Sequence, residues 1–169
     1  LKYTQSKLHL STISSYESVE KIKQAKKNKL NISSDVAAYS LLLSDEWLQT
    51  FDSNLKVFPP LRGEKTRKEL INGIINGTID AVTSDHTPIE IENKKCEFEK
   101  AKFGIIGLHT VFPILNTVLK DKLEVSKIID LICHNPRKIL NKNTPKIQEG
   151  EIANMTLFDP KKEWIYSEE

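Results

Sequence analysis

Short strand-forming stretches alternate with amphipathic helical stretches along this chain, and that alternation constrains its fold more than any other feature. The strand-forming stretches lie at 7–12, at 30–38 with the apolar run 41–43 after it, and at 79–84. Between them, apolar residues recur at helical spacing over 15–29 and 64–76. Strands that alternate with helices favour an α/β fold with a parallel sheet.

The last third of the sequence is predicted to be mostly helical. Helical patterns cover 105–119, 125–133 and 136–140, and Pro113 is expected to kink or break the first of them. The pattern then changes, and 149–160 is predicted to form a short strand that ends in a proline turn.

Polar residues follow the predicted strands, as is typical of a β/α barrel, in which the carboxyl ends of the strands form the functional face. A complete barrel takes ~250 residues, whereas this chain has 169 residues and starts at Leu1 with no element before its first strand. We therefore expect the chain to supply the last few βα units of a longer barrel. A smaller open α/β sheet is the alternative.

The charge balance lacks the basic excess of a nucleic-acid binder, since 25 Lys and Arg residues face 23 Asp and Glu residues. The lysine-rich stretch 21–29 is expected to be the solvated face of a helix. Cys96 and Cys133 lie far apart without partners at metal-ligand spacing, which favours a protein of the reducing cytoplasm. No stretch is apolar for long enough to span a bilayer, so we expect a soluble protein without a membrane partner.

His9 and Asp85 are the strongest candidates for chemistry. His9 lies where a predicted strand passes into a Ser-Thr loop, and Asp85 follows the strand at 79–84, ahead of a polar loop over 85–102. We expect both side chains to emerge side by side from neighbouring parallel strands. An imidazole and a carboxylate there can bind zinc, and the carboxylate can take a proton from metal-bound water. A structural histidine and a turn-capping aspartate are the commoner roles of such residues.

Five motifs resemble, in order and spacing, those of dihydroorotases of the bacterial and multifunctional-complex type. They are His-Leu-Ser-Thr at 9–12, Leu-Lys-Val-Phe-Pro-Pro-Leu-Arg at 55–62, Gly-Thr-Ile-Asp-Ala-Val-Thr-Ser-Asp-His at 77–86, Phe-Gly-Ile-Ile-Gly-Leu at 103–108 and Asn-Pro-Arg-Lys-Ile-Leu at 135–140. The resemblance covers nearly the whole chain, and the shared order argues against chance.

The resemblance implies the C-terminal part of a (β/α)8 metal-dependent hydrolase barrel over 1–145 and a short β segment of a small β domain over 146–169. It also implies zinc, with two ions in the intact protein, and interconversion of dihydroorotate and N-carbamoyl-aspartate in pyrimidine synthesis. His9 matches a metal ligand, and Asp85 matches a carboxylate that is both metal ligand and catalytic base. Phe103 and Gly104 match a segment whose main chain contacts substrate. The other ligands would lie upstream, so the fragment alone is expected to be inactive.

The chain departs from the family at several polar positions. Phe58 stands where the family usually has Asn, and Ile89 where it has a His near the substrate carboxylate. Residues 37–40 read Ala-Ala-Tyr-Ser in place of Thr-Pro-His-His, and Lys102 replaces a Pro. Two missing hydrogen bonds at ~1.5–3 kcal/mol each would weaken binding of a charged substrate by roughly two to four orders of magnitude.

These departures leave three functions open. The first is an active dihydroorotase, for which a homodimer is one expected assembly. The second is an inactive homologue that serves as a structural partner of aspartate carbamoyltransferase. The third is a hydrolase for hydantoins or another cyclic amide, in which Phe58 and Ile89 line a more apolar pocket.

Overall fold

Three parallel strands in the order β1-β2-β3 form the centre of the structure, a computed structural model that describes residues 1–165. They are β1 (Leu8–Leu10), β2 (Ile32–Ala37) and β3 (Ala81–Thr83). β2 is the middle strand, and its residues Ser33 and Ala37 pair with His9 of β1 and Thr83 of β3. The predicted α/β fold with a parallel sheet is confirmed.

Two long helices connect the strands, as the apolar spacing predicts. α1 (Tyr16–Lys27) links β1 to β2, and the side chain of Ser15 caps it by accepting a hydrogen bond from the Ser18 N–H. α3 (Glu64–Ile75) precedes β3. Gly77 follows α3 with a φ of +74°, the left-handed conformation in which glycine commonly ends a helix.

Two helical predictions need correction. The apolar run after β2 belongs to the short helix α2 (Tyr39–Leu42), not to a strand region. An apolar run of this length fits a buried helix as well as a strand, so periodicity could not separate them. The helix α4 (Val111–Leu119) begins later than predicted, which places Pro113 in its first turn. Proline is tolerated there because the missing N–H would have no partner within the helix.

The last helical region is one continuous rod with a wider turn inside it. α5 (Val125–Ile129) passes into a π-helical turn (Asp130–His134) and then into α6 (Asn135–Ile139). The side-chain amide of Asn135 donates a 2.8 Å hydrogen bond to the main-chain carbonyl of Asp80, just before β3. This bond fixes the start of α6 to the sheet.

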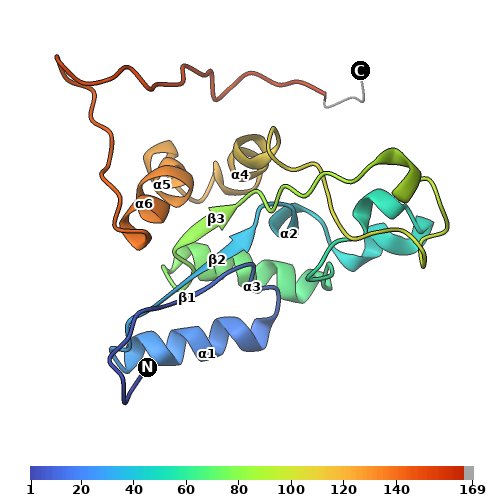
Figure 1. Cartoon of the computed structure of the whole chain (residues 1–169), viewed down its shortest axis with the longest axis horizontal. Coiled ribbons are helices and arrows are strands. Elements are labelled where there is room, and N and C mark those ends of the chain that lie inside the picture. The colour runs from blue at the N-terminus through green and yellow to red at the C-terminus, as the bar shows by residue number, and fades with distance from the viewer. Residues whose placement is uncertain (166–169) are drawn as a thin grey trace.

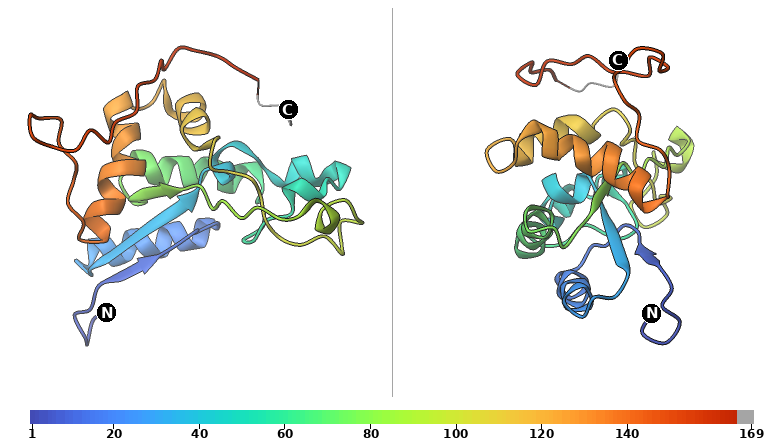
Figure 2. Two further views of the ribbon diagram at one scale, coloured as in Figure 1. Left: turned by 45° about the horizontal axis from the view of Figure 1, so that its top comes forward. Right: turned by 90° about the vertical axis from the view of Figure 1, so that its left-hand side faces the viewer.

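The helices are arranged in two groups around the sheet. α1 and α3 lie on one side of it, whereas α4, α5 and α6 lie beyond β3 (Figures 1 and 2). One hydrophobic core joins both groups, because residues of α1, β2, α3, α4 and α5 pack together in it. Its fully buried side chains include Ile22, Val36, Leu70, Leu115 and Ile128. None of the described helices is long and apolar enough to cross a membrane.

The strand predicted over 149–160 does not form in the described residues, which from 146 to 165 contain neither strand nor helix. A strand needs a neighbour to receive its main-chain hydrogen bonds, and no strand of the described chain lies beside this segment. It lies instead near α4, where the rings of Phe158 and Phe112 are 4.5 Å apart and the Asn116 side chain donates to the carbonyl of Pro160. Residues 166–169 of the expected second domain lie outside the described residues.

Candidate active site

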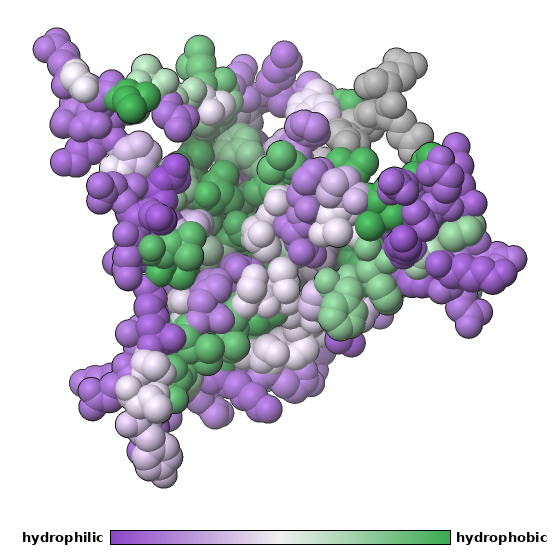
Figure 3. All heavy atoms as spheres, viewed as in Figure 1, coloured by the Kyte–Doolittle hydropathy of each residue, from purple (hydrophilic) through white to green (hydrophobic). Residues whose placement is uncertain are grey.

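A groove of about 530 Å³ lies between the sheet and the helices beyond β3. Its walls come from the sheet, from Leu108 and Val111 before and in α4, and from the region of α6. The view in Figure 3 shows hydrophobic residues gathered in the centre of this side of the molecule, with hydrophilic ones around them. His9 and Asp35 are the two ionisable side chains among the residues that line the groove.

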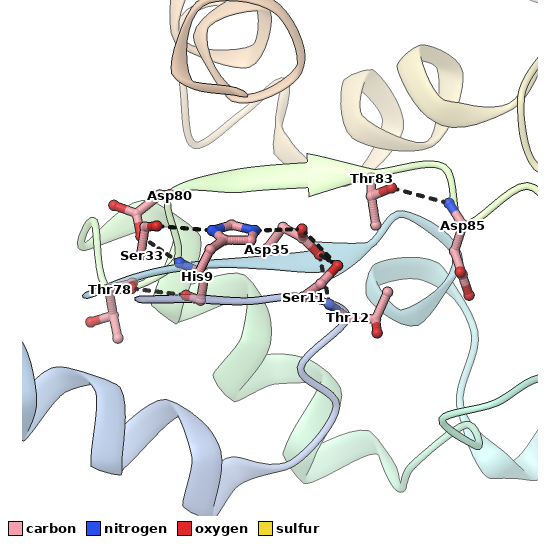
Figure 4. A network of polar contacts seen from close by, with 10 residues as sticks. His9, Ser11, Thr12, Ser33, Asp35, Thr78, Asp80, Thr83 and Asp85 are labelled. Carbon is pink, nitrogen blue, oxygen red and sulfur yellow. Dashed lines mark hydrogen bonds and ion pairs between the residues drawn. The ribbon is translucent and has the colours of Figure 1, made fainter. Parts of the chain in front are cut away.

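Both ring nitrogens of His9 are hydrogen-bonded to residues of β2. Nδ1 lies 2.8 Å from the hydroxyl of Ser33, and Nε2 lies 2.9 Å from Oδ2 of Asp35 (Figure 4). The parallel register places His9 directly opposite Ser33, and Asp35 is two residues further on the same face of β2. His9 is therefore held in one orientation by the neighbouring strand.

Asp35 is a buried carboxylate that joins β1 to β2. Besides His9, it accepts hydrogen bonds from the hydroxyl of Ser11 and, at 2.7 Å, from the main-chain N–H of Thr12. Thr12 has a φ of +50°, an uncommon conformation that the bond to Asp35 stabilises. Asp35 was not among the residues predicted from the sequence, although an acidic residue inside a predicted strand was the signal that could have found it.

Asp85 lies beyond the end of β3 and is paired with Tyr39, the first residue of α2. The Tyr39 hydroxyl donates a 2.6 Å hydrogen bond to Oδ2 of Asp85. Burial, and then the neighbouring Asp85 carboxylate, raise the pKa of Tyr39, so the phenol stays protonated and acts as the donor. Asp85 itself has a φ of +46°, which turns the chain sharply after β3.

His9 and Asp85 do not emerge side by side, and that expectation is wrong. β2 separates their strands, and His9 pairs with Ser33 whereas Thr83, two residues before Asp85, pairs with Ala37. Ser33 and Ala37 are four residues apart, or ~13 Å at ~3.3 Å per residue. In Figure 4 Asp85 lies at one end of the view, and Asp35 and Thr12 are drawn between it and His9. The cause is the stagger between strands, which the sequence does not reveal.

Phe103 and Gly104 lie together with the two apolar replacements, Phe58 and Ile89. The rings of Phe58 and Phe103 meet edge to face at 5.7 Å, and both are at least half exposed. Gly104 has a φ of +151°, and a Cβ there would lie 2.4 Å from the carbonyl oxygen of Thr87 and 2.6 Å from Cγ1 of Ile89. The main chain at Gly104 therefore lies so close to Thr87 and Ile89 that only glycine fits this position. These residues are not among those that line the groove with His9.

The described residues do not by themselves fit a zinc site. They contain no group of three or more His, Cys, Asp or Glu side chains arranged to hold a metal ion, whereas zinc sites in proteins have at least three protein ligands. His9 could bind a metal through Nδ1 only if the Ser33 hydroxyl turned away, while the bond to Asp35 could remain. Asp85 is not among the residues that line the groove with His9.

Comparison with known proteins agrees with the fold. No family model matches the sequence. Proteins named dihydroorotase from Caldicellulosiruptor saccharolyticus and Carboxydothermus hydrogenoformans are 39% and 42% identical, each over 99% of this chain and 40% of its own length. The chain thus spans about two fifths of the length of these relatives.

Solved structures of amidohydrolases share the fold of the chain. The L-hydantoinase (dihydropyrimidinase) of Arthrobacter aurescens superimposes with a TM-score of 0.79 and 27% identity over 90% of this chain and 35% of its own. The inactive dihydroorotase-like domain of a Chaetomium thermophilum multifunctional protein superimposes with a TM-score of 0.64 and 20% identity, over 85% and 40% respectively. The fold is thus part of an amidohydrolase barrel, and it does not by itself decide activity.

Proposed function

Because this chain is homologous to dihydroorotases over nearly all of its residues, we propose that a protein containing it interconverts dihydroorotate and N-carbamoyl-aspartate in pyrimidine synthesis. The observation that carries the proposal is the 42% identity over 99% of the chain to a curated dihydroorotase. The proposal concerns the longer protein, because the chain spans about 40% of the length of that relative. The reaction in this proposal is the hydrolysis of a cyclic amide and its reverse.

In this proposal Asp85 is the proton acceptor at the mouth of the barrel. Its position after β3 supports the role, because functional residues of β/α barrels follow the carboxyl ends of strands. The hydrogen bond from Tyr39 holds one oxygen of the carboxylate, which leaves the other oxygen for a proton. Phe103 and Gly104 would contact the substrate, and His9 would be a metal ligand only together with residues that this chain does not contain.

The test is turnover by the longer protein supplied with zinc. We expect hydrolysis of dihydroorotate, and we expect Asp85→Asn to lower kcat by at least about a hundredfold, the usual contribution of a general base. Asp121→Asn, which makes the same change at an exposed residue, is the control. Absence of turnover by the unchanged protein would reject the proposal, and turnover of substituted hydantoins alone would reassign the substrate.

A second candidate is an inactive homologue that serves as a structural partner of aspartate carbamoyltransferase. The contact between Tyr39 and Asp85 favours it, because the phenol occupies one oxygen of the carboxylate and leaves only the other for a metal ion or a proton. Co-elution of the two proteins in size-exclusion chromatography, without turnover of any cyclic amide, would support it over the first.

A further inference from the structure

Lys94 is a buried lysine whose ammonium group contacts main-chain carbonyls rather than a carboxylate. The residue is 6% exposed. Nζ donates to the carbonyl of Gly104 at 2.7 Å, to that of Ser53 at 2.8 Å and to that of Lys56 at 3.4 Å. No ion pair of Lys94 occurs among residues 1–165. Lys94 therefore joins the loop after β3 to the segment that precedes Phe58.

The number of contacts matches the chemistry of the group. An ammonium has three N–H donors, and here each has a carbonyl acceptor. A charge can be buried only when it is paired or hydrogen-bonded. Burial lowers the pKa of Lys94, which agrees with an ammonium enclosed by neutral acceptors. A lysine that merely filled space would place its charge in solvent instead.

Lys56 makes the reciprocal connection. Its Nζ donates to the carbonyls of Phe98 and Glu99, and it lies 4.9 Å from the centre of the Phe103 ring. Its carbonyl accepts a hydrogen bond from the N–H of Gly104. The lysine of each segment thus donates hydrogen bonds to main-chain carbonyls of the other segment. We call this pair, Lys56 and Lys94, the clamp.

The clamp forms hydrogen bonds with the peptide groups of Gly104 but not with those of Phe103. The N–H of Gly104 donates to Lys56 and its carbonyl accepts from Lys94. Within the described chain, neither the N–H nor the carbonyl of Phe103 has a hydrogen-bond partner. A substrate that contacts the main chain here can therefore use the peptide groups of Phe103.

We propose that Lys94 is a positioning residue that holds the Phe103–Gly104 main chain against Ser53–Lys56 and so presents the unpaired peptide groups of Phe103 to a cyclic-amide substrate. The role toward substrate rests on the proposed function. The role in positioning the loop does not, because it follows from the contacts of Lys94 alone. The two roles can therefore be measured separately.

The experiment uses the longer protein and compares Lys94→Met with Lys95→Met. Both changes remove one lysine charge from the same loop, but Lys95 is exposed. Hydrogen exchange followed by mass spectrometry, without substrate, should show exchange of 53–57 and 98–106 accelerated by about tenfold or more in Lys94→Met. Lys95→Met should leave it unchanged. With a cyclic amide that the protein turns over, Lys94→Met should raise KM more than it lowers kcat.

The outcomes separate the two proposals. Unchanged exchange of both segments in Lys94→Met would overturn the positioning role, and so would equal acceleration over the whole protein. Faster local exchange in a protein that turns over no cyclic amide would reject the proposed function and leave the positioning role standing. If Lys94→Met does not fold, Lys56→Met removes the reciprocal bonds from a less buried residue, and unchanged exchange of 98–106 in it would equally overturn the clamp.

Discussion

The hydroxyl of Tyr39 lies 2.6 Å from Oδ2 of Asp85 and donates a hydrogen bond to it, so the carboxylate beyond β3 already has a partner within the chain. Tyr39 is 3% exposed, and burial holds its ring in place. The main-chain N–H of Ala38, one residue earlier, donates to the carbonyl of Thr83, so the start of α2 is tied to the end of β3 twice. The motif that residues 37–40 resemble has a histidine at the position of Tyr39, which gives the pair a direct test.

Tyr39→His is expected to increase the zinc affinity of the longer protein. The change releases Asp85 and adds an imidazole nitrogen beside it, and imidazole is a good zinc ligand. Tyr39→Phe is the control, because it also releases Asp85 but adds no ligand. The measurement is the zinc bound per chain after dialysis against a weak chelator. We expect the zinc affinity of Tyr39→His to be about tenfold or more above that of the unchanged protein, and we expect no such increase in Tyr39→Phe. Equal zinc in the unchanged protein and both variants would contradict the expectation.

The ion pair between Glu64 and Arg67 is expected to make stability depend on pH in acid. Both oxygens of Glu64 accept hydrogen bonds of 2.6 Å from Arg67, which lowers the pKa of Glu64 from 4.5 to about 2. A carboxyl whose pKa is lower in the folded state stabilises the fold above pH 4.5, and this contribution is lost as pH falls from 4.5 toward 2.

Thermal unfolding between pH 5 and pH 2.5 checks this expectation. Glu64→Gln should unfold at a lower temperature than the unchanged protein at pH 5, and the difference should shrink as the pH falls. Glu69→Gln, on the same helix but without an ion pair in the described structure, is the control and should show no such convergence. A constant difference for Glu64→Gln at every pH would count against the assignment.

Two glycines with positive φ are expected to respond differently to alanine. Gly77 has open space around a Cβ, so Gly77→Ala should cost only the roughly 1–2 kcal/mol of a left-handed alanine. Gly104→Ala also places a methyl 2.4 Å from the Thr87 carbonyl, so we expect a loss of more than about 2 kcal/mol. Urea denaturation of both variants measures the two losses. Equal losses of unfolding free energy in the two variants would mean that the loop at Gly104 moves to accommodate the methyl group, which would contradict the expectation.

Local patterns in the sequence were sufficient to predict the strands and the two long helices. α1 and α3 carry apolar residues at helical spacing, and these are the residues that pack in the core. The four-residue helix α2 was missed because an apolar run so short has no period to read. The strand over 149–160 was predicted from a local pattern that ends in a proline turn, but a strand also requires a neighbour, which no local pattern supplies.

The candidate site could be predicted only in part, for a similar reason. The residues His9 and Asp85 were found from their positions near the ends of predicted strands, but how far apart they lie depends on strand order and register, and the structure places His9 inside β1. Tyr39 was visible as a departure from the family, yet its bond to Asp85 needs two elements to meet. Lys94 gave no signal in a loop rich in charge, because burial of a lysine depends on tertiary contacts.

The π-helical turn between α5 and α6 rotates the side chains of α6 around the helix axis relative to those of α5. Successive residues of an α-helix are ~100° apart, and a wider turn shifts every later side chain around the axis. Ile128 and Leu131 can thus face the core while Asn135 reaches the main chain of Asp80 at the foot of β3. Removing one residue from Asp130–His134 would return the rod to regular winding and rotate α6, which lines the groove with Pro136 and Ile139, away from the sheet.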